Sequence, residues 1–524
     1  MSNILPAGSL NPNATIAPGV YILEKLPSAP ISGVETDVIL TVGTGTWGPI
    51  NFPVVIGNLT EQVNAFGKPT TEAFDMGTQV MAAASVGAIN FLSIRVTDGT
   101  DIKAVIPILD NQLVPVTGMT VTAKYSGTVG NTINVLISEG TNSTIALPTF
   151  KITIYLPTGT GSGIPEIYDN IGGTGLALWQ AMVDAINMGQ GGQTAPSELV
   201  TAVIGTATLP PELFNYVLVG GTNGNSGVTA TIVLGSDTLP LTGMYAASGA
   251  DFSLMVLAGV TDSATFLAQA VFAANQGAYA MLARPLGESY ATGITEKKTI
   301  GLVSYATKFM VGETWIKIND DFNNVQRYIS QQGLIAGVFS LLPPEESGLN
   351  KVISSSIFIS TYFSDQNKRY SSADIIQILQ NGLDTIANPS PGGNYLALQT
   401  GKNTSNNILA STDPFTRLTN FIAGSLQDAL GIYVGQLQNN TQKQSALTLA
   451  NSFLSKLAAQ NVIGMSNVPV GTIPPQPFSV AIDSSQAGIG IEIVNVRVAF
   501  FNVIVAILVN LQTGLQTISS VTQQ

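Results

Sequence analysis

The sequence contains no cysteine and no histidine. Without cysteine there can be no disulfide, no thiolate nucleophile and no cysteine-ligated zinc or iron–sulfur site. Without histidine the chain cannot build a Ser-His-Asp triad or a zinc site of the HExxH type. These absences exclude most hydrolase chemistry. We therefore expect no enzymatic activity, no catalytic residues, no cofactor and no metal site.

Charge is also scarce, and most of it is negative. Charged residues make up 10% of the 524 residues, where about 25% is usual in globular proteins. The chain has 20 Lys and Arg against 32 Asp and Glu, a net charge of −12, and no basic run. It thus lacks the basic footprint that a nucleic-acid-binding protein needs. Apolar residues still make up 45%, so the chain can bury cores and should fold, in about three or four domains.

Long apolar runs are missing as well. The first 20 residues lack the basic and apolar regions of a secretory signal. The most apolar stretch, residues 498–511, is interrupted by Asn502 and Asn510 and is shorter than the roughly 20 residues that cross a bilayer. We expect a soluble protein without direct membrane insertion, and we interpret this stretch as a buried strand.

Both ends of the chain are nearly uncharged. Residues 1–21 contain no charged side chain and carry three prolines, and residues 485–524 contain only Glu492 and Arg497. Proline disfavours a helix, and alternating β-branched residues favour strands. We therefore expect extended arms that can form strands, an N-terminal arm of residues 1–22 and a C-terminal arm of residues 501–524.

Between the arms, strand and helix patterns alternate. Short apolar runs predict strands at residues 38–42, 91–96, 252–257 and 279–283, and helical spacing predicts helices at 72–86 and 263–275. This order is typical of a twisted α/β sheet.

Residues 113–237 have a different texture. They contain short strand patterns, at 119–124, 133–137, 150–156 and 229–234, and one helical pattern at 176–186. Seven acidic residues stand against two basic ones. Because the α/β pattern resumes afterwards, we interpret this segment as a mostly β domain inserted into a discontinuous α/β domain, and we expect a solvated lobe that faces outward.

The last third has strong helix signals. Asp413 followed by Pro414 is a typical helix start, and an apolar stripe then runs from Phe415 to Leu437. Thr441 with Gln444 has the pattern of a capping box that opens another helix. Since the stripe must face a core, Arg417 should lie off it, on the exposed side.

One glycine motif could suggest nucleotide chemistry. Gly43, Gly45 and Gly48 spell GxGxxG directly after a predicted strand, but in a dinucleotide site the third glycine lies inside a helix. Here Pro49 and an extended segment follow. We interpret the motif as a turn. An α/β enzyme that uses this glycine loop remains an alternative hypothesis.

Several short motifs follow one another along the chain. Residues 18–21 read PGVY, residues 31–36 read ISGVET and residues 47–49 read WGP. Later come KYSGTVGNTINVLI at residues 124–137 and LVGGTNGNSG at residues 218–227. In this order and spacing they resemble the opening, the strand pair and the glycine loop of the contractile tail sheath proteins of bacteriophages. Further matches, at residues 333–344, 379–386 and 404–440, carry the resemblance through the Asp413-Pro414 helix.

The resemblance implies a structural subunit of a virion tail, assembled in the cytoplasm of a bacterial host. Such subunits form homo-oligomers, hexameric rings that stack into a helical sheath around an inner tail tube protein, with baseplate and tail terminator proteins at the ends. Contraction drives the tube through the host envelope for genome ejection. The family's termini add strands to the sheets of neighbouring subunits, which assigns that role here to Ile16, Val20, Tyr21, Ile22, Val503, Val505, Ile507 and Val509.

The resemblance also places a helical C-terminal region against the tube, with Arg417 and Lys443 as the tube-facing candidates. The expected fold class is a mixed α/β (α+β) multidomain chain: a discontinuous α/β sheath domain (23–112 plus 238–395), the inserted outward β-rich domain (113–237), a C-terminal tube-facing α/β domain (396–500) and the two arms. The alternative from another class is a secreted or surface β-rich adhesin, which low charge and abundant Ser, Thr, Asn and Gly would suit.

Overall fold

The structure is a computed structural model. It describes residues 31, 33–157, 163–388, 395–468 and 471–504, together with the backbone of the short strands β1 (Asn3–Leu5) and β2 (Tyr21–Leu23). The chain divides into two compact units. We call residues 33–424 the first unit, and residues 1–32 together with residues 425–524 the second unit. Each unit is described by itself.

The centre of the first unit is a six-stranded sheet. Its spatial order is β15 (Lys308–Met310), β14 (Tyr279–Ala283), β13 (Leu254–Leu257), β3 (Ile39–Gly43), β5 (Phe91–Arg95) and β4 (Val54–Ile56). All neighbours are parallel except β4, which pairs antiparallel with β5 at the edge. The inner strands are buried throughout and mostly apolar, as a parallel sheet covered on both faces requires.

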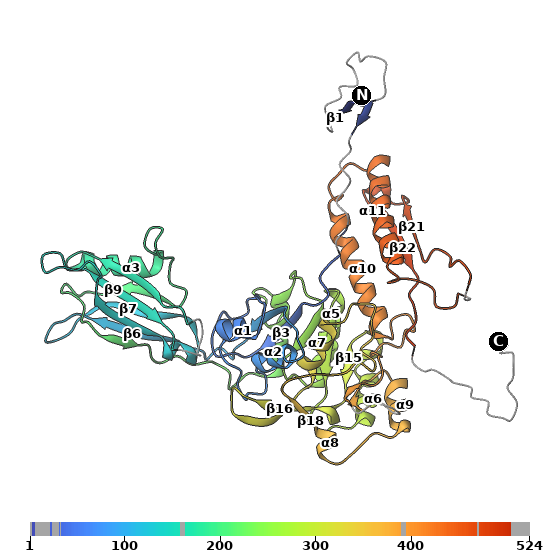
Figure 1. The fold of residues 1–524 in the computed structure, drawn as a ribbon, viewed down its shortest axis with the longest axis horizontal. Helices are drawn as coiled ribbons and strands as arrows, with labels where there is room; N and C mark the ends of the chain where they lie inside the picture. The colour runs from blue at the N-terminus through green and yellow to red at the C-terminus, as the bar shows by residue number, and fades with distance from the viewer. Residues whose placement is uncertain are drawn as a thin grey trace. The chain divides into compact units, whose positions relative to one another are not determined.

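Helices cover both faces of this sheet (Figure 1). On one face Ile39, Val256 and Met281 pack against α2 (Met76–Ala84) and α7 (Gln332–Ser340). On the other face Leu40 and Leu282 pack against α5 (Ser263–Asn275). Neighbouring residues of a strand point to opposite faces, so each strand serves both cores. The expectation of a mixed α/β chain is confirmed.

Smaller elements complete the unit. Around the main sheet lie α1 (Leu59–Phe66), α4 (Ala230–Leu234), α6 (Tyr290–Thr299), α8 (Tyr362–Asp365) and α9 (Ser372–Gln380). A three-stranded antiparallel sheet has the order β17 (Val325–Ile329), β16 (Ile316–Asp320), β18 (Phe358–Thr361), and β19 (Ile386–Ala387) pairs with β20 (Ala397–Leu398).

A segment between β5 and β13 forms what we call the lobe, two antiparallel sheets and a helix with a core of their own. One sheet has the order β10 (Glu166–Ile171), β9 (Phe150–Tyr155), β8 (Asn134–Glu139), β12 (Asn215–Val217). The other has the order β11 (Val200–Ile204), β7 (Thr117–Ser126), β6 (Lys103–Leu109). Helix α3 (Leu176–Met188) packs on both sheets and buries Trp179.

A buried arginine ties the lobe to the central sheet. Arg95, the last residue of β5, is fully buried. Its guanidinium donates to the carbonyls of Gly48 at 3.0 Å, Ser126 at 2.7 Å and Asn223 at 2.9 Å. Burial lowers the pKa of Arg95 to about 10, and Asp101 opposes that shift. One side chain thus joins the end of β5, the end of β7 and the segment that leaves the lobe.

The second unit contains the end of one helix, a second helix and a hairpin, besides β1 and β2. Helix α10 (Asp413–Gly431) starts in the first unit and ends in the second, and α11 (Asn440–Ala459) packs against strand β21 (Phe478–Asp483), which pairs antiparallel with β22 (Ile493–Val498). Among the residues described, no helix is long and apolar enough to cross a membrane.

Four local predictions were wrong. Residues 498–511 were expected as a buried strand, but β22 ends at Val498, and Phe501 and Ile504, which follow it, are exposed. Residues 229–234 were expected as a strand but form helix α4, because Val233 packs into the core beside α5; short apolar runs do not separate strand from helix. The cap of α11 is Asn439, whose side chain accepts from the Gln442 backbone, not Thr441. The stripe that was expected to continue to Leu437 ends with α10 at Gly431.

Candidate assembly surfaces

The strand candidates of the two arms lie mostly outside the described residues. Ile16, Val20, Val505, Ile507 and Val509 are outside them. Tyr21 and Ile22 belong to β2, whose backbone pairs in parallel with β1. Val503 is half-buried and lies outside the strands described.

The β21–β22 hairpin is the structure's clearest candidate for accepting a strand. Its cross-strand pairs Phe478–Val498, Val480–Val496 and Ile482–Val494 are all apolar, and they alternate with pairs such as Ser479–Arg497. The apolar face therefore packs on α11. Within the described residues β21 and β22 pair only with each other, so both outer edges of this small sheet are open. An open edge presents unpaired backbone donors and acceptors to another chain.

Lys443 lies beside this hairpin. Its ammonium is 3.1 Å from Glu492 and donates to Ser484 at 2.7 Å. Hydrogen bonds from Ser484, Gln438 and Lys443 lower the pKa of Glu492. Lys443 keeps about a fifth of its side chain exposed. It therefore ties α11 to the start of β22 while part of it still reaches the surface.

The expectation that Arg417 is exposed is wrong. Its side chain is 5% exposed, and its guanidinium donates to the carbonyls of Phe339 and Leu342, each at 2.9 Å, and lies over the Phe339 ring at 5.3 Å. Burial lowers its pKa to about 10, and the charge of Asp413 opposes that shift. Arg417 binds the carbonyl end of α7, where a positive charge is favourable. This residue cannot contact a tube without leaving that site.

Leu437, which was expected to face a core, is exposed, and other apolar residues near it are exposed as well. In the loop between α10 and α11, Ile432, Val434 and Leu437 are exposed by 61%, 85% and 84%. Ile489 and Ile491, which precede β22, are exposed as well, and Gln438 donates to the Ile491 carbonyl at 3.4 Å. We call these five residues the apolar rim. An apolar cluster of this kind is typical of a surface that another chain covers.

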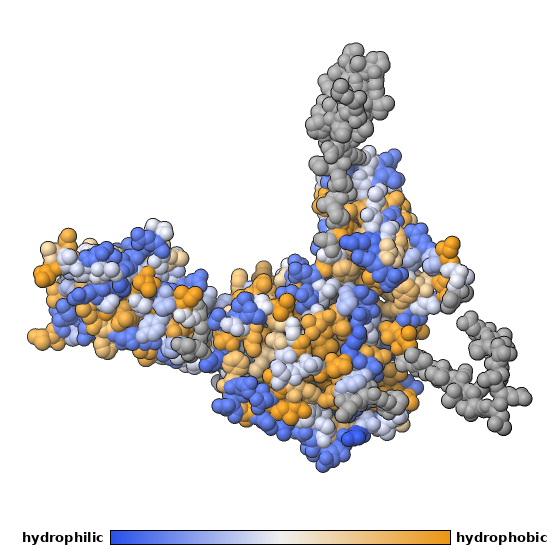
Figure 2. All heavy atoms as spheres, viewed as in Figure 1, coloured by the Kyte–Doolittle hydropathy of each residue, from blue (hydrophilic) through white to orange (hydrophobic). Residues whose placement is uncertain are grey.

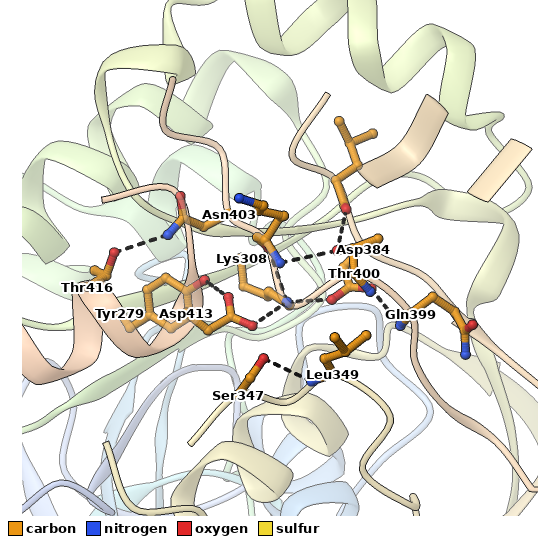
Figure 3. Close-up of polar contacts among 12 residues, drawn as sticks. Tyr279, Lys308, Ser347, Leu349, Asp384, Gln399, Thr400, Asn403, Asp413 and Thr416 are labelled. Atoms are coloured by element: carbon orange, nitrogen blue, oxygen red, sulfur yellow. Dashed lines mark hydrogen bonds and ion pairs between the residues drawn. The ribbon is translucent and has the colours of Figure 1, made fainter. Parts of the chain in front are cut away.

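Sequence reasoning missed a buried charge cluster in the first unit (Figure 3). Lys308 of β15 is 2.5 Å from Asp384 and 2.9 Å from Asp413, and the Tyr279 hydroxyl donates to Asp413 at 2.5 Å. All four side chains are fully buried. The second oxygen of Asp384 accepts from the backbone of Thr385, Gln399 and Thr400.

The electrostatics of the cluster follow from burial and pairing. Burial raises the pKa of Asp413, and Lys308 opposes that shift. Burial alone would lower the pKa of Lys308, but Asp384 and Asp413 together raise it above the usual lysine value. Burial and the neighbouring Asp413 raise the pKa of Tyr279 well above its usual range, so its hydroxyl stays a donor. The cluster fixes the first residue of α10 to the edge of the central sheet.

The glycine motif is a packing feature. A Cβ on Gly43 would come within 2.4 Å of the Phe74 carbonyl, and one on Gly48 within 2.3 Å of the Ala65 carbonyl. Gly48 has a φ of +91°, which is not helical, and the extended strand β4 follows it. The described residues hold no group of three or more acidic side chains that could bind a metal ion. The motif thus has the close packing of a turn and lacks the helix start that a pyrophosphate needs.

No protein-family model and no curated protein sequence matches the chain. Solved structures do match. A sheath tail protein from Listeria innocua has a TM-score of 0.55 at 15% identity, over 89% of this chain and 93% of its own. A sheath tail protein from Desulfitobacterium hafniense has a TM-score of 0.54 at 16% identity, over 88% and 93%.

A third match is the sheath of an extracellular contractile injection system, PVC, in the contracted state, with a TM-score of 0.50 at 12% identity over 96% of this chain and 99% of its own. The chain has the fold of contractile tail sheath proteins. The resemblance seen in the sequence is thereby confirmed at the level of the fold, over nearly the full length of these sheath proteins.

Proposed function

We propose that the chain is the sheath subunit of a contractile, phage-like tail. The observation that carries this proposal is the sheath-protein fold over 88% to 96% of the chain, which includes both described units. In the proposed particle six copies form a ring, the rings stack around an inner tube, and contraction drives the tube through an envelope for genome ejection. Its end partners are baseplate and terminator proteins, and assembly takes place in the host cytoplasm.

In this proposal the chain consists of a discontinuous α/β sheath domain around the central sheet, an outward β-rich insertion, a C-terminal tube-facing domain and two arms. The separate cores of the central sheet and the lobe support the first two parts. The direction in which each part faces is an expectation from the sheath fold.

Strand addition is the proposed means of cohesion. A two-stranded sheet is marginal on its own, and the β21–β22 hairpin has two open edges within the described residues. The arm sequences are uncharged and have patterns that favour strands, so backbone hydrogen bonds can join them to these edges without charge pairing. The arms of neighbouring copies would then turn each hairpin into a larger sheet.

The apolar rim supports a second contact, with the tube or with a neighbouring copy. It is formed by exposed aliphatic side chains beside Lys443 and Glu492. Since Arg417 is buried, Lys443 is the candidate that remains for a charge contact with an acidic tube. A single exposed contact of this kind contributes about 0 to 1 kcal/mol, and its effect would come from repetition over many copies.

The function is proposed as structural and not enzymatic, in keeping with the sheath proteins of the same fold. Neither the enzyme alternative nor the adhesin alternative has a specific observation in its favour. Negative-stain electron microscopy of the purified chain tests the proposal. We expect striated tubes with six subunits per ring. Particles that stay monomeric under conditions of high concentration and added tube protein would contradict it.

A further inference from the structure

One end of the lobe carries exposed apolar residues on two neighbouring loops. The first loop, residues 110–116, joins β6 to β7, and the second, residues 205–214, joins β11 to β12. The exposed fractions are 105% for Leu113, 79% for Val114, 45% for Leu209, 49% for Leu213 and 55% for Phe214. Figure 2 shows orange, hydrophobic residues at loop ends of the lobe. We call these five residues the lobe tip.

Hydrogen bonds hold the two loops together. The backbone of Asn111 donates to the Pro210 carbonyl at 3.0 Å, and the backbone of Glu212 donates to the Leu109 carbonyl at 3.0 Å. The indole of the buried Trp179 donates to the Leu209 carbonyl at 2.9 Å. The lobe tip is therefore a preformed surface, and a ligand would not have to order it first.

The lobe tip is far from the junction with the central sheet. Strand β7 begins at Thr117, next to the first loop, and ends at Ser126, which binds Arg95. Ten residues of strand span roughly 30 Å. The lobe's own core is already filled by other residues, so neither folding nor attachment of the lobe explains why these apolar side chains are exposed.

The charges around the lobe tip select the kind of partner. Neither loop contains Lys or Arg, and Glu212 and Glu139 are exposed beside it. Glu139 ends β8, and β8 is tied to the second loop by the bond from the Ile137 backbone to the Phe214 carbonyl at 3.0 Å. A second copy of the tip would bring like charges together, and so would a membrane of anionic lipid.

We propose that the lobe tip binds a partner protein whose contact surface is apolar at its centre and rich in Lys or Arg at its rim. The apolar side chains supply the affinity through burial, and the carboxylates of Glu139 and Glu212 select and orient a basic rim. This interaction goes beyond the proposed sheath function, and it can be tested on the unassembled full-length chain.

The probe is a synthetic amphipathic helix of leucine and lysine, and its matched control is a helix of leucine and glutamate. Fluorescence anisotropy with the full chain should show binding of the basic peptide and none of the acidic one. The double variant Leu113→Ser/Phe214→Ser should weaken binding by about tenfold or more. The variant Glu139→Gln/Glu212→Gln should weaken it less and reduce its dependence on salt.

Ile102→Ser is the matched control variant, because Ile102 is an exposed apolar residue at the other end of the lobe, where its carbonyl accepts from Gly127. It should bind the basic peptide as the unmodified chain does. Equal binding of both peptides, or equal loss in the Ile102 variant, would overturn the proposal. Dimers of the unmodified chain that the double variant abolishes would also overturn it, because they assign the tip to a second copy. Binding to phosphatidylcholine vesicles that the double variant abolishes would overturn it as well, because it assigns the tip to lipid.

Discussion

The ammonium of Lys308 pairs with two buried carboxylates, Asp384 at 2.5 Å and Asp413 at 2.9 Å. A complete buried ion pair contributes little to the free energy of unfolding. The loss of one partner is strongly destabilising, because it leaves an uncompensated buried charge. The cluster holds the start of α10, the helix that continues into the second unit. Its importance therefore lies in fixing that helix to the central sheet.

We predict that Lys308→Met lowers the free energy of unfolding by about 3 to 5 kcal/mol. Lys298→Met is the control, because Lys298 is exposed, and its effect should stay within about 0.5 kcal/mol. Guanidinium denaturation of the unassembled chain measures both. A Lys308 variant as stable as the Lys298 variant would show that the cluster does not fix α10.

Asp75 gives the subunit a pH dependence. It caps α2 and accepts from the Thr78 backbone at 2.7 Å, and burial raises its pKa to about 6 against the opposing hydrogen bonds from Thr78 and Thr70. The folded state thus keeps a proton that the unfolded state has lost between about pH 4 and pH 6. The contribution of Asp75 to the free energy of unfolding must therefore fall as the pH rises through this window.

We predict that Asp75→Asn removes this part of the pH dependence, which amounts to a free energy on the order of 3 kcal/mol, and leaves the cap in place. Urea denaturation of both proteins at a series of pH values from 4 to 7 measures it. If the two proteins lose stability in parallel across the window, Asp75 is not the group that titrates.

Helices and strands that depend on interactions between neighbouring residues of the chain were predictable from local sequence patterns. The predicted helix at 263–275 and strand at 279–283 coincide with α5 and β14, because Asp262 caps the helix and the strand is apolar throughout. Contacts between distant segments were not predictable. Arg417 binds carbonyls of residues 339–343, and Lys308 meets Asp413 from 105 residues away; no spacing in the sequence indicates either contact.

The end of α10 shows a different limit. The helical spacing of apolar residues predicted that the stripe continues to Leu437, but the helix ends at Gly431 and Leu437 is exposed. An apolar pattern indicates that a residue will be covered, but not whether its own chain or another chain covers it. In the proposed polymer, another copy or the tube would cover the exposed side chains of the apolar rim.

The N-terminal arm should act on assembly and not on folding. Deletion of residues 1–20 removes no charged side chain, so we predict a soluble, cooperatively folded subunit that forms no long tubes. A finer pair of variants separates backbone from side chain. Val20→Pro/Ile22→Pro should abolish tubes because proline cannot donate a strand hydrogen bond, whereas Val20→Thr/Ile22→Thr should retain them. Electron microscopy and thermal unfolding measure both properties, and long tubes from the proline variant would refute strand addition by this arm.

At the scale of the whole molecule, the lobe has its own core and is joined to the central sheet through Arg95 and a few loop contacts. We predict that replacing residues 103–219 with a short Gly/Ser linker leaves a subunit that still polymerises into tubes of smaller outer diameter. Some stability will be lost, because Trp47 is buried against the lobe core and Arg95 loses the Ser126 carbonyl. Failure of a folded variant to polymerise would place a polymer contact on the lobe.

We propose that copies of this chain polymerise by adding strands to one another. A cryo-electron microscopy reconstruction of the assembled chain, at a resolution that traces the backbone, shows whether they do. We expect β21 and β22 to be flanked on their outer edges by arm strands from other copies. A polymer in which this hairpin remains two-stranded, with the arms bound to their own subunit, would contradict it.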